Sequence, residues 1–129
     1  MDLKIDEAKN IAYIKISGPV SSVEVLSAFD TAVSADNYTM GMGRLWDFRE
    51  VDLSAIDSDT IRNMAKYSLS FPPGICDVKV AIVTARTLEY GLTRMFEMFS
   101  TDAKSIVRVF KTMEEAEKWM MEEERRQND

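Results

Sequence analysis

The chain has 129 residues, of which 46% are hydrophobic and 29% are charged, and its formal net charge is −6. This length suits one domain with its own core, and the acidic balance without any basic run argues against nucleic acid or an anionic membrane surface as a partner. Histidine is absent and Cys76 is the only cysteine, which excludes an internal disulfide and every Ser-His or Cys-His nucleophile pair. No cofactor or metal site is expected, and the alternative that stays open is a magnesium or calcium site made of carboxylates alone.

Apolar and polar residues alternate twice near the start of the chain, over residues 2–6 and over residues 11–17. A period of two is typical of strands with one buried face. The polar turn between them predicts that the two strands pair antiparallel as a hairpin. Ser17-Gly18-Pro19 ends the second strand.

A helix follows this hairpin. Ser21 and Glu24 form the pattern of a capping box, which satisfies backbone donors at a helix start and predicts a helix over Ser22–Ser34. A loop over residues 36–43 then leads to a strand predicted over residues 44–49.

The second half of the chain repeats the alternation of helix and strand. Asp57 or Ser58 is the expected cap of a helix with apolar residues at positions i, i+3, i+4 and i+7. The near-continuous apolar run over residues 78–83 is typical of a strand buried on both faces. The next helix is expected to turn one apolar face to the core, formed by Leu88, Leu92, Met95, Phe96 and Phe99.

The last predicted elements are a strand over residues 106–110 and a helix opened by Thr112 with Glu115 in a second capping-box pattern. Residues 122–129 are expected to form a charged tail. The order is therefore β-β-α-β-α-β-α-β-α. It predicts one α/β domain over residues 1–129, with a five-stranded mixed, mostly parallel sheet flanked by four helices.

This order and several phrases of sequence resemble the SpoIIAA-like family of the STAS/Sec14-like (CRAL-TRIO-like) class. The phrases span most of the chain: Ile16-Ser17-Gly18-Pro19-Val20, Leu45-Trp46-Asp47-Phe48-Arg49, Val80-Ala81-Ile82-Val83, Tyr90-Gly91-Leu92-Thr93-Arg94-Met95-Phe96-Glu97 and Glu114-Glu115-Ala116-Glu117-Lys118-Trp119. The resemblance implies a small bacterial STAS-type domain.

Within that class, anti-sigma-factor antagonists are switched by phosphorylation of a serine in an Asp-Ser-Ser-Gly motif at a helix start. The corresponding stretch here is Asp57-Ser58-Asp59-Thr60, which lacks the second serine and the glycine. Ser58 is the candidate phosphorylation site, and the alternative is that Asp57-Ser58-Asp59 is a plain helix cap with acidic residues at the positive helix end.

Candidate ligand-binding residues come from three places, because related Sec14-like domains bind lipids and the resemblance implies a carrier of nonpolar molecules. The strand ends that favour ligands in parallel sheets carry two arginines, which are candidates for an anion site beside the following helix starts. The alternative is that Asp47 pairs with one of them or with another base and that both arginines are exposed to solvent. The loop over residues 36–43 holds three apolar or aromatic side chains, which are candidates for an exposed cluster that suits a partner surface or a pocket lid. Three more positions fall off the core-facing stripe of the third helix and are candidates for a groove or a dimer contact, with core packing as the alternative. The candidates are Tyr38, Met40, Met42, Arg49, Arg86, Tyr90, Arg94 and Met98.

These observations predict a non-enzymatic binding or regulatory module, expected to be a homodimer, that holds a small nonpolar ligand or docks a protein partner. One alternative is a regulator controlled by phosphorylation at Ser58. Another is an enzyme that uses a carboxylate or Cys76. No apolar stretch approaches the ~20 residues of a membrane span, and the first residues lack the basic start and apolar run of a signal peptide, so the cytoplasm is the expected compartment.

Overall fold

The computed structural model describes residues 1–100 and 106–122, and it confirms the predicted order of elements. Within these residues the strands and helices are β1 (Asp2–Asp6), β2 (Ile11–Pro19), α1 (Ser22–Val33), β3 (Gly43–Asp52), α2 (Ser58–Leu69), β4 (Lys79–Val83), α3 (Thr87–Phe99), β5 (Ile106–Phe110) and α4 (Met113–Met121). Beyond residue 122 the predicted charged tail lies outside the described residues.

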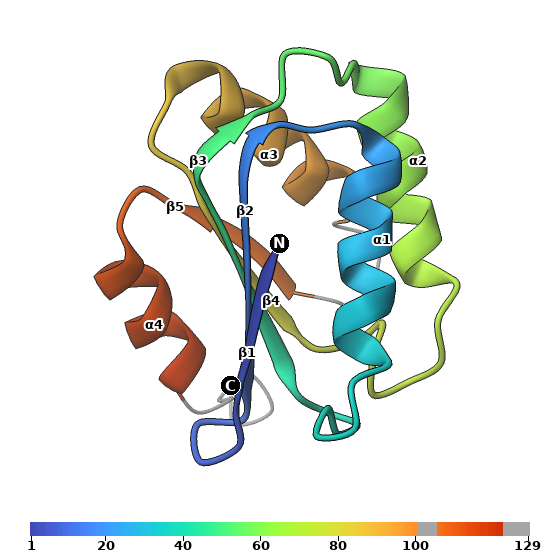
Figure 1. Cartoon of the computed structure of the whole chain (residues 1–129), viewed down its shortest axis with the longest axis vertical. Coiled ribbons are helices and arrows are strands. Elements are labelled where there is room, and N and C mark those ends of the chain that lie inside the picture. The colour runs from blue at the N-terminus through green and yellow to red at the C-terminus, as the bar shows by residue number, and fades with distance from the viewer. Residues whose placement is uncertain (101–105, 123–129) are drawn as a thin grey trace, which may run out of the picture.

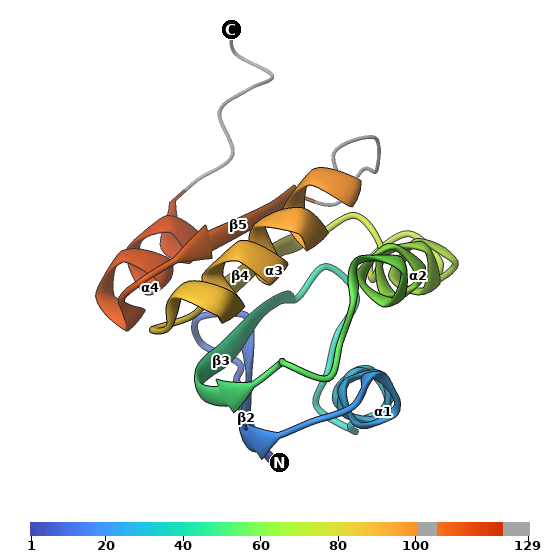
Figure 2. The same ribbon diagram turned by 90° about the horizontal axis from the view of Figure 1, so that it is seen from above.

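The five strands form one mixed sheet in the order β1-β2-β3-β4-β5. As predicted, β1 pairs antiparallel with β2, and the other neighbours are parallel. Helices α1, α2 and α3 cover one face of the sheet, and α4 covers the other face (Figures 1 and 2). Each crossover helix from β2 to β5 therefore packs on the same side, as right-handed connections between sequential strands require.

The predicted helix caps are present. Ser21 and Glu24 form a complete capping box, and the Thr112 hydroxyl accepts from the backbone N–H of Glu115. Strand β3 is longer than the predicted 44–49, because its pairing with β2 shifts register after Lys15 and then continues to Asp52.

Alternate residues of β3 point to opposite faces of the sheet and belong to two separate cores. Trp46 and Phe48 belong to the larger core under α1, α2 and α3, whereas Leu45 belongs to the smaller core under α4, together with Trp119. The face of the sheet under α1, α2 and α3 therefore carries the larger apolar core, and the face under α4 carries the smaller one.

Helix α3 differs from its predicted core face at two points. Leu88 is 47% exposed, while Glu89 is fully buried and Thr93 is 3% exposed. The buried stripe therefore begins with a carboxylate, and Leu92, Met95, Phe96 and Phe99 are only partly buried beside it. No helix in the two described ranges is both long and apolar enough to cross a membrane.

Candidate functional site

A cavity of about 70 Å³ lies in the larger core, between the sheet and the helices α1, α2 and α3. Its walls come from these helices, from β3, β4 and β5, and from the connection between β3 and α2. The polar groups among the lining side chains belong to Arg44, Trp46, Tyr67, Ser68 and Thr93. Such a concave, apolar space with a few polar groups is the usual form of a small-molecule site.

Arg44 is the charged residue of this cavity, and it is only 2% exposed. Its Nη1 donates a hydrogen bond of 2.8 Å to the hydroxyl of Tyr38, which in turn donates to the carbonyl of Met42. The guanidinium carbon lies 4.9 Å from the centre of the Phe29 ring. The buried Nε has no hydrogen-bond partner, and no described carboxylate forms an ion pair with Arg44.

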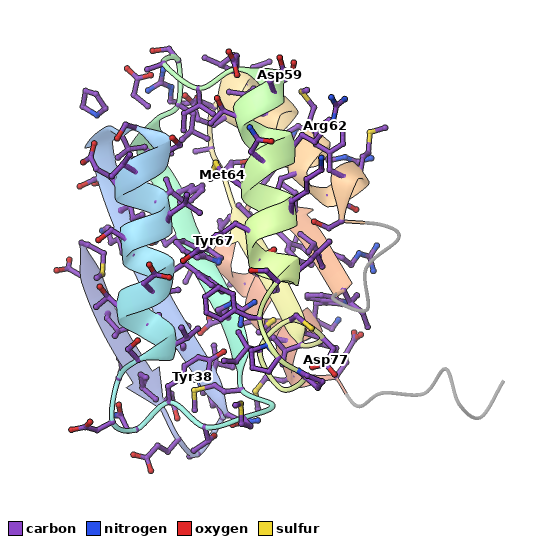
Figure 3. All side chains as sticks on the ribbon, turned by 90° about the vertical axis from the view of Figure 1, so that its right-hand side faces the viewer. Tyr38, Asp59, Arg62, Met64, Tyr67 and Asp77 are labelled. Carbon is purple, nitrogen blue, oxygen red and sulfur yellow. The ribbon has the colours of Figure 1, made fainter. Side chains whose placement is uncertain are left out.

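Aromatic side chains and one bridging hydrogen bond close the space between α1 and α2. The Phe29 ring packs edge-on against Phe71 at 4.9 Å and against Tyr67 at 6.1 Å. The Tyr67 hydroxyl donates to Asp30 on α1 at 2.8 Å, and this hydrogen bond raises the pKa of Tyr67. Figure 3 faces the two helices and shows Met64 and Tyr67 on the side of α2 that is turned toward α1.

A second polar arrangement lies at the carboxyl end of β3. Arg49 donates two side-chain hydrogen bonds to the carboxylate of Asp47, from Nε at 2.9 Å and from Nη2 at 2.8 Å. These bonds lower the pKa of Asp47, against the opposing effect of burial. The alternative in which Asp47 pairs with Arg49 is therefore the one present, and this guanidinium already has its anion.

The Asp47–Arg49 pair predicts a pH dependence of stability. A carboxylate whose pKa is lower in the folded protein than the ~3.9 of an unfolded aspartate contributes stability above that value, and this contribution is lost as the pH falls through the folded pKa. We expect Asp47→Asn to be less stable than the parent at neutral pH, with a shallower loss below about pH 4. Urea unfolding at a series of pH values measures this difference, and two parallel curves would contradict it.

A third polar arrangement joins the start of α3 to the cavity wall. The Glu89 carboxylate accepts the backbone N–H of Leu53 at 2.9 Å, and its other oxygen lies 3.3 Å from Nε of Arg86, without the alignment of a hydrogen bond. Arg86 itself is mostly exposed. Because Leu53 lines the cavity, Glu89 fixes part of its wall.

The candidate residues of the loop before β3 are only partly brought together. Tyr38 is half-buried and bonds Arg44, which places it beside the cavity. Met40 is 65% exposed, as expected for a surface cluster. Met42 is 1% exposed, so its expected place in that cluster is wrong: it packs into the interior just before β3 begins.

The α3 candidates lie away from the cavity. Lys111 lies over the ring of Tyr90 at 4.8 Å, Arg94 lies 3.6 Å from Glu97, and Met98 is 67% exposed. The expected dimer contact or groove at this side of α3 stays a prediction.

Ser58 is the exposed first residue of α2, and the carboxylate of Asp57 caps that helix by accepting the N–H of Thr60 at 2.9 Å. This bond lowers the pKa of Asp57. The plain helix cap is therefore present, and phosphorylation of Ser58 stays a prediction. Cys76 is a half-buried free thiol, and no cluster of three metal-ligating side chains occurs in the described part of the chain.

Arg44 and Glu89 are the two site residues that the sequence analysis missed. Arg44 shares an alternation with Trp46 and Phe48, and this spacing would have placed it on their apolar face. Glu89 and Thr93 are spaced as i and i+4, which would have placed them on one side of the helix.

Comparison with known proteins defines the fold. No protein-family model matches the chain, and no curated protein matches it. The structure is similar to the crystal structure of an uncharacterized DUF3478-family protein from Shewanella loihica PV-4, which has a SpoIIAA-like fold. The likeness covers 92% of each chain, with a TM-score of 0.56 and 17% sequence identity. The chain therefore has the SpoIIAA-like fold that its sequence predicted.

Proposed function

We propose that this SpoIIAA-like domain is a non-enzymatic binding module that holds a small nonpolar ligand in the cavity beneath α1, α2 and α3. The observation that carries the proposal is the cavity itself. A space of about 70 Å³ remains inside a layer of otherwise packed apolar side chains. Protein interiors normally close such gaps, because unfilled space forfeits packing contacts.

The size and lining of the cavity limit the ligand. An engineered apolar cavity of ~150 Å³ holds benzene, so about 70 Å³ encloses only part of a six-carbon chain. A slender molecule therefore fits best, with the rest of its chain along the half-buried wall residues Leu26, Tyr67 and Phe96. Burying each methylene group contributes ~0.8 kcal/mol, so five of them give about the −4.1 kcal/mol of a millimolar dissociation constant. A neutral six-carbon alcohol is a suitable probe.

We expect 1-hexanol to bind with a dissociation constant of about 1 mM. The reporter is the indole N–H of Trp46, which lines the cavity, followed by NMR during titration. Trp119 belongs to the core on the opposite face of the sheet, and its indole N–H serves as the internal control. A shift of the Trp46 resonance alone supports the proposal.

Ser68→Leu provides the matched variant. Ser68 is a half-buried residue of α2 that lines the cavity, and a leucine there adds an apolar side chain to this space while suiting a helix. Ser27→Leu makes the same change on the exposed side of α1. We expect hexanol binding to weaken by roughly tenfold in Ser68→Leu, a loss of ~1.4 kcal/mol, and to persist in Ser27→Leu. The proposal fails if hexanol moves neither indole resonance, or if both variants bind it as the parent does.

The expected homodimer and a protein partner stay predictions. Exposed apolar side chains occur on several elements rather than on one of them. They are Met1, Val23 on α1, Met40 in the following loop, Leu88 and Met98 on α3, and Met121 on α4.

A further inference from the structure

Arg44 is a permanent cation in an apolar space. The guanidinium group stays protonated in proteins, so burial cannot be relieved by loss of the proton. The side chain is 2% exposed and lines the cavity, where its charge faces a phenol hydroxyl and the ring of Phe29. Its Nε is buried without an acceptor.

Arg44 lacks the anionic partner that a buried charge normally has. Burying an ion costs several kcal/mol, which an opposite charge offsets only when it lies close and is hydrogen-bonded. The other two arginines of the site regions have carboxylates: Arg49 pairs with Asp47, and Arg86 lies beside Glu89. Among the residues that the structure describes, Arg44 has the phenol of Tyr38 as its only hydrogen-bond acceptor.

We infer that the ligand of this cavity is an apolar monocarboxylate, whose carboxylate pairs with Arg44 while its nonpolar body lies along the apolar wall. A carboxylate can accept two parallel hydrogen bonds from one edge of a guanidinium group, and the edge that carries Nε is one such edge. Tyr38 already occupies Nη1, so it holds the planar group in place and leaves that other edge for the ligand. The inference rests on the proposed function and adds the chemical class of the ligand.

The experiment compares hexanoate with 1-hexanol, which have the same chain length and differ in the charge of the head group. A charge-assisted hydrogen bond contributes ~1.5–3 kcal/mol, so we expect hexanoate to bind roughly 10- to 100-fold more tightly than hexanol. In the parent protein, hexanoate should also shift the Nε–H resonance of Arg44, whereas hexanol should leave it nearly unchanged.

Arg44→Met tests the role of the charge, because methionine keeps an unbranched apolar chain without the guanidinium. We expect the preference for hexanoate over hexanol to disappear in this variant, while hexanol still binds. Arg62→Met removes the same charge from an exposed site on α2 and should keep the preference. The variant should fold, since it removes an unpaired buried charge; the Arg44 resonance in the parent protein decides the question independently.

The outcomes separate the two proposals. If neither compound moves the Trp46 resonance, the proposed function fails and this inference fails with it. If hexanol binds and hexanoate binds no more tightly, this inference alone is wrong. Inorganic phosphate that displaces hexanoate at equal concentration would show that the site takes a small anion, and would also overturn the inference.

Discussion

Phe29→Ala is expected to lower the free energy of unfolding by about 3–5 kcal/mol, the usual cost of truncating a buried phenylalanine. The Phe29 side chain is 5% exposed and contacts two further rings, those of Tyr67 and Phe71. It also covers the guanidinium of Arg44. Truncation therefore removes apolar burial, two edge-on ring contacts and the cover of a buried charge at once. Urea unfolding followed by circular dichroism measures the change.

The same variant should alter binding, because water gains access to Arg44 once the ring is gone. We expect the preference for hexanoate over hexanol to shrink, since hydration competes with the carboxylate. Phe71→Ala is the matched control: Phe71 shares the ring cluster but is only half-buried and does not line the cavity. It should cost less stability and leave the ligand preference intact. Equal effects of the two truncations would contradict the role assigned to Phe29.

Glu89→Ala is expected to lower the free energy of unfolding by about 2–4 kcal/mol, because it removes a hydrogen bond to a charged group and leaves a buried donor without a partner. The donor is the backbone N–H of Leu53, whose side chain lines the cavity and is 2% exposed. Loss of this anchor should therefore also weaken hexanol binding. Chemical unfolding and the Trp46 titration report the two effects.

Glu89→Gln and Arg86→Ala distinguish the hydrogen bond from the ion pair. Glutamine keeps an oxygen that accepts the Leu53 N–H, so we expect a loss of about 1 kcal/mol. Arg86 is 56% exposed in its side chain but Glu89 is buried, so Arg86→Ala leaves a buried carboxylate without its cation and should cost more than the loss of an exposed ion pair. If Glu89→Gln were as unstable as Glu89→Ala, the charge and not the hydrogen bond would carry the effect.

The order of elements followed from local signals in the sequence. The alternation over residues 11–17, the capping box of Ser21 with Glu24 and the apolar run over residues 78–83 each depend on neighbours close in the chain. The length of β3 did not follow, because residues 50–52 join the sheet through pairing with β2 beyond a register shift, and such pairing depends on a partner far along the chain.

The site was predicted less completely than the fold, for a related reason. A search for apolar periodicity considers apolar residues alone. It therefore could not predict that the charged residues Arg44 and Glu89 occupy buried positions. Tyr38 was a candidate from its loop, but its contact with Arg44 depends on how the chain packs before β3. Arg49 and Arg86 were candidates from the strand ends, and the structure places an anionic partner beside each of them.

The walls of the cavity come from almost the whole chain, from Val25 on α1 to Val107 on β5. Because the lining residues run from the first helix to the last strand, the walls of the cavity are complete only when β5 has joined the sheet. A ligand of the proposed kind would therefore bind the native state and not partly folded chains. Its binding would then stabilise the folded state by mass action, to an extent set by the ratio of the ligand concentration to its dissociation constant.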